Sequence, residues 1–206
     1  MSTERPRAAR KAPAERRTEI GLAARNLALD EGLGALTLRG VAARVGVASG
    51  LVAHYEPSME VLVARTFSEL VHAEFDDVRA AVGESASPTS RLTALVATLL
   101  DGTRDDVSSL WADAWSLGRS LPLLAAAARE HMDEWHAFAA GILRDGVARG
   151  EFRAPEPDVV ALQLFALVDS TAAYSLVDYR TGRERTHLVR QSLESSLALP
   201  PGRLTP

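Results

Sequence analysis

The chain has 206 residues, of which 47% are hydrophobic, and its net charge is −4. Its length allows one or two domains with a sizeable core, and the absence of cysteine excludes disulfides, thiolate metal sites and a cysteine nucleophile. No apolar stretch reaches the roughly 20 residues that span a bilayer, and the arginine-rich start lacks the apolar segment of a secretory signal. We therefore predict a soluble cytoplasmic protein with no membrane partner.

The charge is divided unevenly along the chain. Residues 1–55 carry nine Lys and Arg against five Asp and Glu, whereas the remainder carries fourteen against twenty-two. Phosphate contacts depend on local charge, because screening removes the effect of charges beyond about 8 Å. The asymmetry favours a small basic head that binds nucleic acid on a larger acidic body.

The chain begins with a basic segment. Residues 1–13 are predicted to be a disordered basic arm, and its cations suit the narrow minor groove of DNA as well as they suit a solubilising tail. They are Arg5, Arg7, Arg10 and Lys11. A first helix is predicted over 14–31, and Gly32 ends it.

Residues 37–55 have the pattern of two short helices joined by a tight turn. Thr37 is a candidate N-cap, and Gly46 supplies the backbone freedom that a sharp turn requires. Four apolar residues then recur at helical spacing on one face: Leu38, Val41, Ala42 and Val45. A helix-turn-helix presents its second helix to the major groove of DNA in this way.

The polar and basic residues around this motif are the predicted DNA contacts. Gly50 lets the backbone approach DNA closely, and His54 and Tyr55 offer hydrogen bonds that fix the register. The candidates are Thr37, Arg39, Arg44, Ser49, Gly50, His54 and Tyr55, with Arg16 and Arg17 on the first helix. Ordinary polar residues on a solvated helix would look similar, and Thr37 could serve only as a cap.

The rest of the chain also reads as helical. A long helix is predicted over 59–82, and the following ones over 91–102, 105–119, 122–149, 157–177 and 184–199. No segment shows the alternation of a β-strand. The predicted fold is all-α, with a helix-turn-helix DNA-binding domain over 14–57 and a larger helical ligand-binding and dimerisation domain over 58–200.

The body carries aromatic side chains and an isolated acid. Asp169 lies in an otherwise apolar helix, and a buried carboxylate needs a partner. The predicted ligand-binding residues are Trp111, Trp115, Trp135, Phe138, Phe165, Asp169 and Tyr174. Aromatic faces beside an acid suit a quaternary amine, with Asp113 and His136 as other possible anchors, although the same aromatics could simply form core.

No pattern of catalytic residues is present. His131 and His136 lie near acids, but five residues of helix turn their side chains about 140° apart, which disfavours a shared metal. No Ser-His-Asp order, phosphate-binding glycine loop or paired carboxylate stands out. We predict that the chain is not an enzyme and has no metal site and no cofactor.

The last two predicted helices are apolar enough to bury a face against a second copy. Two helices from each chain would form a four-helix bundle with two-fold symmetry, and the sequence predicts a homodimer. The alternative is that both helices only close the core of one chain.

Together these residues resemble the TetR family of bacterial transcription regulators over about the first 65 positions. The resemblance lies in Ala24, Gly32, Thr37-Leu38, Val41-Ala42, Val45-Gly46-Val47, Ser49-Gly50, His54-Tyr55, Glu60 and Leu62. The body resembles the C-terminal domain of the BetI-type branch at Trp111, Trp115, 146–152 and 166–169. The resemblance implies a repressor that binds a palindromic double-stranded DNA operator as a homodimer and is released by a small-molecule effector.

Four positions depart from the family pattern. Ala48 stands where a capping Ser or Thr is usual, and Glu56 stands where a packed Phe is usual. Met59 stands where a phosphate-contacting Lys is usual, and Ala53 stands where the family often has an aromatic residue. These departures support an alternative function, namely a helical ligand-binding or protein-interaction module with weakened or lost DNA binding.

Overall fold

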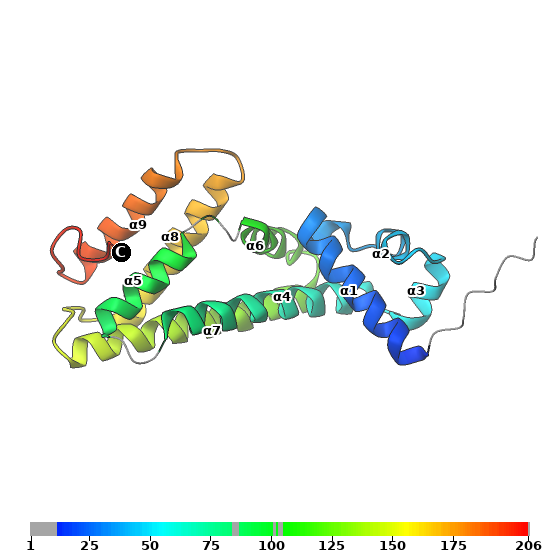
Figure 1. The fold of residues 1–206 in the computed structure, drawn as a ribbon, viewed down its shortest axis with the longest axis horizontal. Coiled ribbons are helices and arrows are strands. Elements are labelled where there is room, and N and C mark those ends of the chain that lie inside the picture. The colour runs from blue at the N-terminus through cyan, green and yellow to red at the C-terminus, as the bar shows by residue number, and fades with distance from the viewer. Residues whose placement is uncertain (1–11, 84–86, 101, 103–104, 206) are drawn as a thin grey trace, which may run out of the picture.

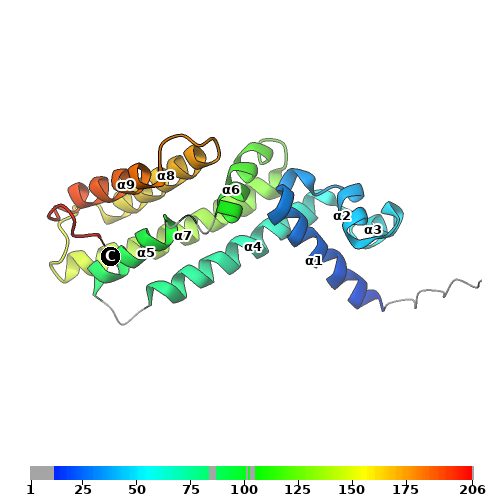
Figure 2. The ribbon, with the colours of Figure 1, turned by 45° about the horizontal axis from the view of Figure 1, so that its top comes forward.

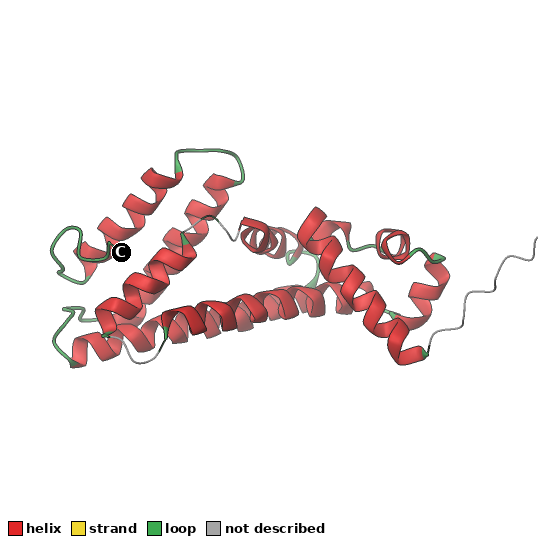
Figure 3. Cartoon of the chain, in the orientation of Figure 1, coloured by secondary structure: helices red, strands yellow, loops and turns green. Residues whose placement is uncertain are grey.

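The computed structural model describes residues 12–83, 87–100, 102 and 105–205 (Figure 3). Over these residues it has nine α-helices and no strand, which confirms the all-α fold. The molecule is elongated, and helices α4 and α7 run side by side along its length (Figures 1 and 2). The basic arm predicted over 1–13 lies almost wholly outside the described residues.

The head comprises α1 to α3 and one short 3₁₀ turn. Thr37 caps α2, since its Oγ1 accepts a hydrogen bond from the Gly40 amide at 3.0 Å. Gly46 ends α2 with φ at +76°, a left-handed conformation that favours glycine. The elements are α1 (Pro13–Glu31), η1 (Leu33–Ala35), α2 (Leu38–Val45) and α3 (Ser49–Tyr55). The predicted helix-turn-helix is present.

The body comprises α4 to α9. Two of these helices begin earlier than the sequence predicts, because Ser87 caps α5 and Thr181 forms a capping box with Glu184 at the start of α9. The elements are α4 (Met59–Val82), α5 (Pro88–Leu99), α6 (Asp105–Leu117), α7 (Pro122–Ala148), α8 (Pro157–Ser175) and α9 (Gly182–Ser196).

Two apolar cores meet along α4. The head core extends from Ile20 to Val71 and includes side chains from two body helices: Leu110 and Ala114 of α6, and Leu124 and Ala128 of α7. The body core starts at Phe75. The packing therefore changes from one core to the other within α4, although the predicted domain boundary lies at its start, near residue 58.

Helix α6 is joined to the head by a hydrogen bond as well as by apolar packing. The Asp113 carboxylate accepts a hydrogen bond from the Leu33 amide at 2.7 Å. Gly32 adopts a φ of +84°, and a Cβ built on it would lie 2.6 Å from Asp113 Oδ2. Only glycine satisfies both the backbone conformation and the close approach of the carboxylate.

Hydropathy gives no sign of a membrane span. Within the described part of the chain, no helix is sufficiently long and apolar to cross a bilayer.

We predict that Asp113→Ala lowers the free energy of unfolding by about 1–3 kcal/mol, because the Leu33 amide loses its charged acceptor. Urea unfolding followed by circular dichroism measures the change. Asp133→Ala is the matched control, since Asp133 is an exposed aspartate on α7. Equal stabilities for the two variants would contradict the role of Asp113 in holding the head.

Candidate DNA-binding surface and ligand cavity

Helix α3 buries one side and exposes the other. Val52 is fully buried in the head core, whereas Gly50, Ala53 and His54 are exposed. Ser49 and Tyr55 are half-buried at the two ends of the helix. The exposed side is small and weakly polar, which leaves room for close approach to a nucleic acid groove.

Tyr55 has a packing role that the sequence did not indicate. Its ring packs against the head core, and the guanidinium of Arg17 lies 5.7 Å from the ring centre. The His54 ring meets it edge-on at 5.1 Å. Tyr55 therefore orients neighbouring side chains of this surface, and only part of it is available to a partner.

The predicted arginine contacts fall into two groups. Arg17 and Arg39 are exposed and have no acidic partner within the described residues. Arg44 instead forms ion pairs with Asp30 at 2.6 Å and Glu31 at 3.2 Å. Arg16 pairs with Glu19 at 2.6 Å. Because their charges are already compensated, Arg16 and Arg44 are weaker candidates for phosphate contact than the sequence suggested.

Glu56, which departs from the family pattern, is accommodated in the fold. The residue is buried, and its Oε1 accepts a hydrogen bond from Arg65 Nη2 of α4 at 2.7 Å. A paired carboxylate avoids the cost of an isolated buried charge. Glu56 therefore links α3 to α4 where an aromatic residue would otherwise pack.

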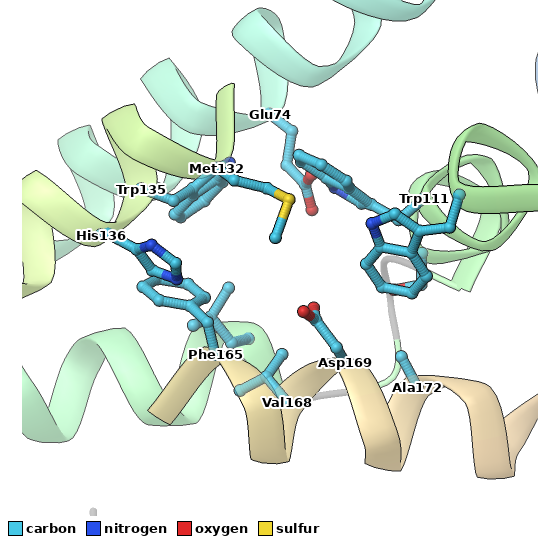
Figure 4. A pocket seen from close by; sticks show the side chains of 12 residues that line it. Glu74, Trp111, Met132, Trp135, His136, Phe165, Val168, Asp169 and Ala172 are labelled. Carbon is cyan, nitrogen blue, oxygen red and sulfur yellow. The ribbon is translucent and has the colours of Figure 1, made fainter. Parts of the chain in front are cut away.

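The body encloses a cavity of about 60 Å³ between α4, α6, α7 and α8. Five of the predicted ligand-binding residues line it, namely Trp111, Trp115, Trp135, Phe165 and Asp169. Figure 4 shows the Asp169 carboxylate pointing from α8 toward the middle of the cavity. Trp115 is 36% exposed and lies at its edge, whereas Trp135 is buried.

Burial in the cavity perturbs the carboxyl group of Asp169. It forms no hydrogen bond or ion pair with the described residues. Burial without a compensating partner raises its pKa from the usual 3.8 to about 7. His136 of α7 and Glu74 of α4 are the other titratable groups on the cavity wall. An apolar cavity that holds such an acid has an electrostatic preference for a cation.

Three predicted or considered residues lie elsewhere. Phe138 packs against Phe75 in the body core, with ring centres 5.6 Å apart, and is not part of the cavity wall. Tyr174 packs against Tyr179 at 5.2 Å, near the end of α8. Asp113 faces the head. The structure therefore does not bring Phe138, Tyr174 or Asp113 to the cavity.

The sequence analysis missed several residues of the cavity wall. The largest are Glu74 and Met132, and Met132 lies one helical turn before His136. The others are Leu99, Ser108, Val168 and Ala172. The i, i+4 relation between Met132 and His136 was available in the sequence, but nothing there indicated that this side of α7 faces a cavity.

The acidic and histidine residues of α7 do not converge on a metal site. His131 is buried, and its Nδ1 lies 3.3 Å from Glu134 Oε2. No group of three potential ligands that could hold a metal occurs among the residues that the structure describes.

Helix α8 also carries an exposed apolar stripe. Val159 and Leu162 are 54% and 55% exposed, and Leu188 of α9 is 46% exposed. Ala166 and Ala173 continue the stripe along α8. Within the chain, Gln163 holds the two helices together through Ser192 and Ser196, at 2.7 and 2.9 Å.

Comparison with known families identifies both parts of the chain. The model of bacterial regulatory proteins of the tetR family matches residues 20–66. The model of the C-terminal domain of BetI-type transcriptional repressors matches residues 88–198, more than half of the chain. The chain belongs to the TetR family of transcriptional regulators. As the sequence predicts, this is a family of DNA-binding regulators and not of enzymes.

Individual relatives agree with this assignment. The chain is 26% identical over 175 residues to the HTH-type transcriptional repressor KstR2 of Mycolicibacterium smegmatis, which is 82% of each protein. A transcriptional regulator from Saccharomonospora viridis, solved in complex with choline, has a TM-score of 0.78 at 23% identity, covering 88% of this chain and 96% of its own. A regulator from Pseudomonas aeruginosa PAO1 has a TM-score of 0.75 at 20% identity, with 95% of both chains covered. The two structures share the fold.

We predict that Asp169 makes the TetR-family chain less stable as pH rises. The pKa of Asp169 is higher in the folded chain, so the folded chain binds more protons than the unfolded chain between about pH 4 and pH 7. Stability therefore falls through this window and levels off above it. The Asp169→Asn variant should lack this contribution, which is at most about 4 kcal/mol.

Urea unfolding of the wild type and of Asp169→Asn at a series of pH values isolates this contribution as the difference between the two. Asp133→Asn, on the exposed side of α7, controls for the loss of one negative charge. A difference between wild type and Asp169→Asn that stays constant from pH 4 to pH 8 would show that Asp169 has an ordinary pKa.

Proposed function

We propose that this protein is a cytoplasmic repressor that binds a palindromic operator as a homodimer and is released by a small organic cation bound in the cavity. The observation that carries the proposal is the double role of α6. One side of this helix contributes Trp111 and Trp115 to the cavity wall, and another contributes Asp113 and Leu110 to the head.

The DNA contacts are proposed on the exposed side of the helix-turn-helix. Gly50 and His54 of α3 would meet the major groove, with Ser49 and the Tyr55 hydroxyl at the two ends of the contact. Arg17 and Arg39 would meet phosphates, because their charges are uncompensated. Thr37 is exposed beside Arg39 and can contact a phosphate through its hydroxyl while it caps α2.

The homodimer is proposed to form through the exposed stripe on α8 together with α9. A contiguous apolar stripe of this kind favours a partner with a matching surface, and a second copy supplies one by two-fold symmetry. The resulting four-helix bundle would hold two heads at the spacing of successive major-groove faces, roughly 34 Å on one side of the duplex.

The effector is proposed to act through α6. A ligand between Trp111 and Asp169 changes the position that α6 prefers, and the Asp113–Leu33 hydrogen bond passes this change to the head. The ligand must bind the two arrangements unequally for any release to occur, and coupling energies of about 1–3 kcal/mol are typical.

A quaternary ammonium compound is the proposed effector class. Tryptophan faces attract such cations, and the Asp169 carboxylate neutralises them in a small apolar cavity. The choline complex of the Saccharomonospora viridis regulator, which has the same fold, supports choline as the first compound to test.

We predict that the protein binds DNA upstream of its own gene more tightly than a scrambled duplex, with two chains per operator. Fluorescence anisotropy measures the affinity, which should fall by orders of magnitude between about 50 and 200 mM salt. Because Tyr55 packs on the head core, Tyr55→Phe removes only the hydroxyl, and it should weaken operator binding about 5- to 30-fold.

The matched control for this variant is Tyr179→Phe, which removes the hydroxyl of an exposed tyrosine in the body. Equal affinity for operator and scrambled DNA would favour the alternative of a helical module that has lost DNA recognition. If Tyr55→Phe binds the operator as tightly as the wild type, the Tyr55 hydroxyl does not contact DNA.

We predict that choline binds in the cavity, quenches or shifts tryptophan fluorescence, and releases operator DNA. Its affinity should rise with pH up to about 7 and then level off, because the cation favours the ionised form of Asp169. Asp169→Asn should weaken binding about 10- to 100-fold and remove this pH dependence.

Asp133→Asn serves again as the control, since it removes an equal charge outside the cavity. Saturable choline binding of equal strength in the wild type and in Asp169→Asn would place the cation elsewhere. Failure of choline to bind at millimolar concentration would overturn the assignment of this effector class.

A further inference from the structure

A second cavity adjoins the one that holds Asp169. It measures about 140 Å³ and lies between α5, α6, α8 and the start of α9. Four residues belong to the walls of both cavities, so the two spaces are neighbours along α8. They are Leu99, Ser108, Val168 and Ala172.

The chemistry of the second cavity differs from that of the first. Its wall carries hydroxyl groups and one cation, Arg185, whereas the wall of the first carries tryptophans and the acids Asp169 and Glu74. Ser175 and Thr171 donate their hydroxyl protons to backbone carbonyls of α8, at 2.7 and 2.9 Å. Arg185 is therefore the group in this cavity with the charge to attract an anion.

The guanidinium of Arg185 is held in place without being neutralised. Its Nη1 donates to the backbone carbonyls of Tyr179 and Arg180, at 3.4 and 2.7 Å. No Asp or Glu within the described residues forms an ion pair with it. A positioned arginine without an acidic partner is suited to a carboxylate, which its remaining N–H groups can bind in a bidentate manner.

The separation of the two cavities sets the length of a ligand that fills both. Asp169, Ala172 and Ser175 follow one another at three-residue steps, from the first cavity through the shared wall to the second. Six residues of helix at about 1.5 Å per residue place the backbone positions of Asp169 and Ser175 roughly 9 Å apart along this wall. A ligand that reaches both ends must separate its two charges by several bonds.

We propose that the effector of this regulator is zwitterionic, with a quaternary ammonium group against Asp169 in the first cavity and a carboxylate against Arg185 in the second. This inference rests on the proposed binding of an organic cation in the first cavity and adds the class of its second functional group. Arg185 thereby allows the regulator to distinguish organic cations that carry a carboxylate from those that do not.

The test compares choline with a series of trimethylammonium carboxylates of increasing methylene chain length, using tryptophan fluorescence or calorimetry on the full chain. The shortest member should gain nothing over choline, because it cannot reach Arg185 from the first cavity. A longer member should bind about 10- to 100-fold more tightly than choline, which is the effect expected of one charged hydrogen-bonded pair.

Arg185→Gln should abolish this ratio of zwitterion to choline affinity. Arg183→Gln is the matched control, because it removes an exposed cation of the same helix from outside the second cavity, and it should keep the ratio. Arg185→Lys retains the charge and should keep part of the ratio. Circular dichroism establishes that each variant is folded.

The possible results separate this inference from the one on which it rests. If choline binds but no zwitterion exceeds it, or if Arg185→Gln keeps the ratio, the second site is overturned while the organic-cation site stands. If neither choline nor any member of the series binds, both are overturned. A chain-length optimum that disappears in Arg185→Gln supports the inference.

Discussion

The structure depends on one helix being shared between two environments. Helix α6 packs Leu110 and Ala114 into the head core and contributes Trp111 and Trp115 to the cavity. Its Asp113 carboxylate accepts a hydrogen bond from the Leu33 amide of the head. Because close-packed interiors do not deform continuously, a helix in this position cannot move on one side without disturbing the other. The head and the body are therefore mechanically linked, although Leu33 and Asp113 are 80 positions apart in the chain.

The proposed DNA-binding surface of the head has little net charge. Two of its arginines, Arg16 and Arg44, are paired with acids of α1, whereas Arg17 and Arg39 have no acidic partner among the described residues. The charge of Glu56 is also compensated, because Arg65 forms an ion pair with it where an aromatic residue would otherwise pack. Local uncompensated charge, rather than the charge of the whole chain, governs phosphate contact, which reconciles an overall charge of −4 with the head of a DNA-binding regulator.

The two cavities of the body combine apolar walls with isolated charged side chains. In the first, tryptophan and phenylalanine rings exclude water around Asp169, and this raises the free energy of its ionised form. A cation beside Asp169 would favour the ionised form. In the second, backbone carbonyls hold Arg185 in position but leave its charge uncompensated. The two environments have opposite electrostatic preferences along one face of α8.

The sequence by itself determined the all-α fold, the helix-turn-helix and the limits of most helices, because helical periodicity, caps and glycines act over a few neighbouring residues. It also grouped Trp111, Trp115 and Asp169 by chemical type, and the structure brings these three residues to one cavity. It could not determine that Phe138 and Tyr174 lie outside that cavity, or that Asp113 accepts a hydrogen bond from the head. Nor could it determine that Arg44 and Glu56 each have an ion-pair partner of their own. Those outcomes depend on which faces of distant helices meet, and only tertiary packing decides this, since contacts between residues far apart in the chain leave no local pattern in the sequence.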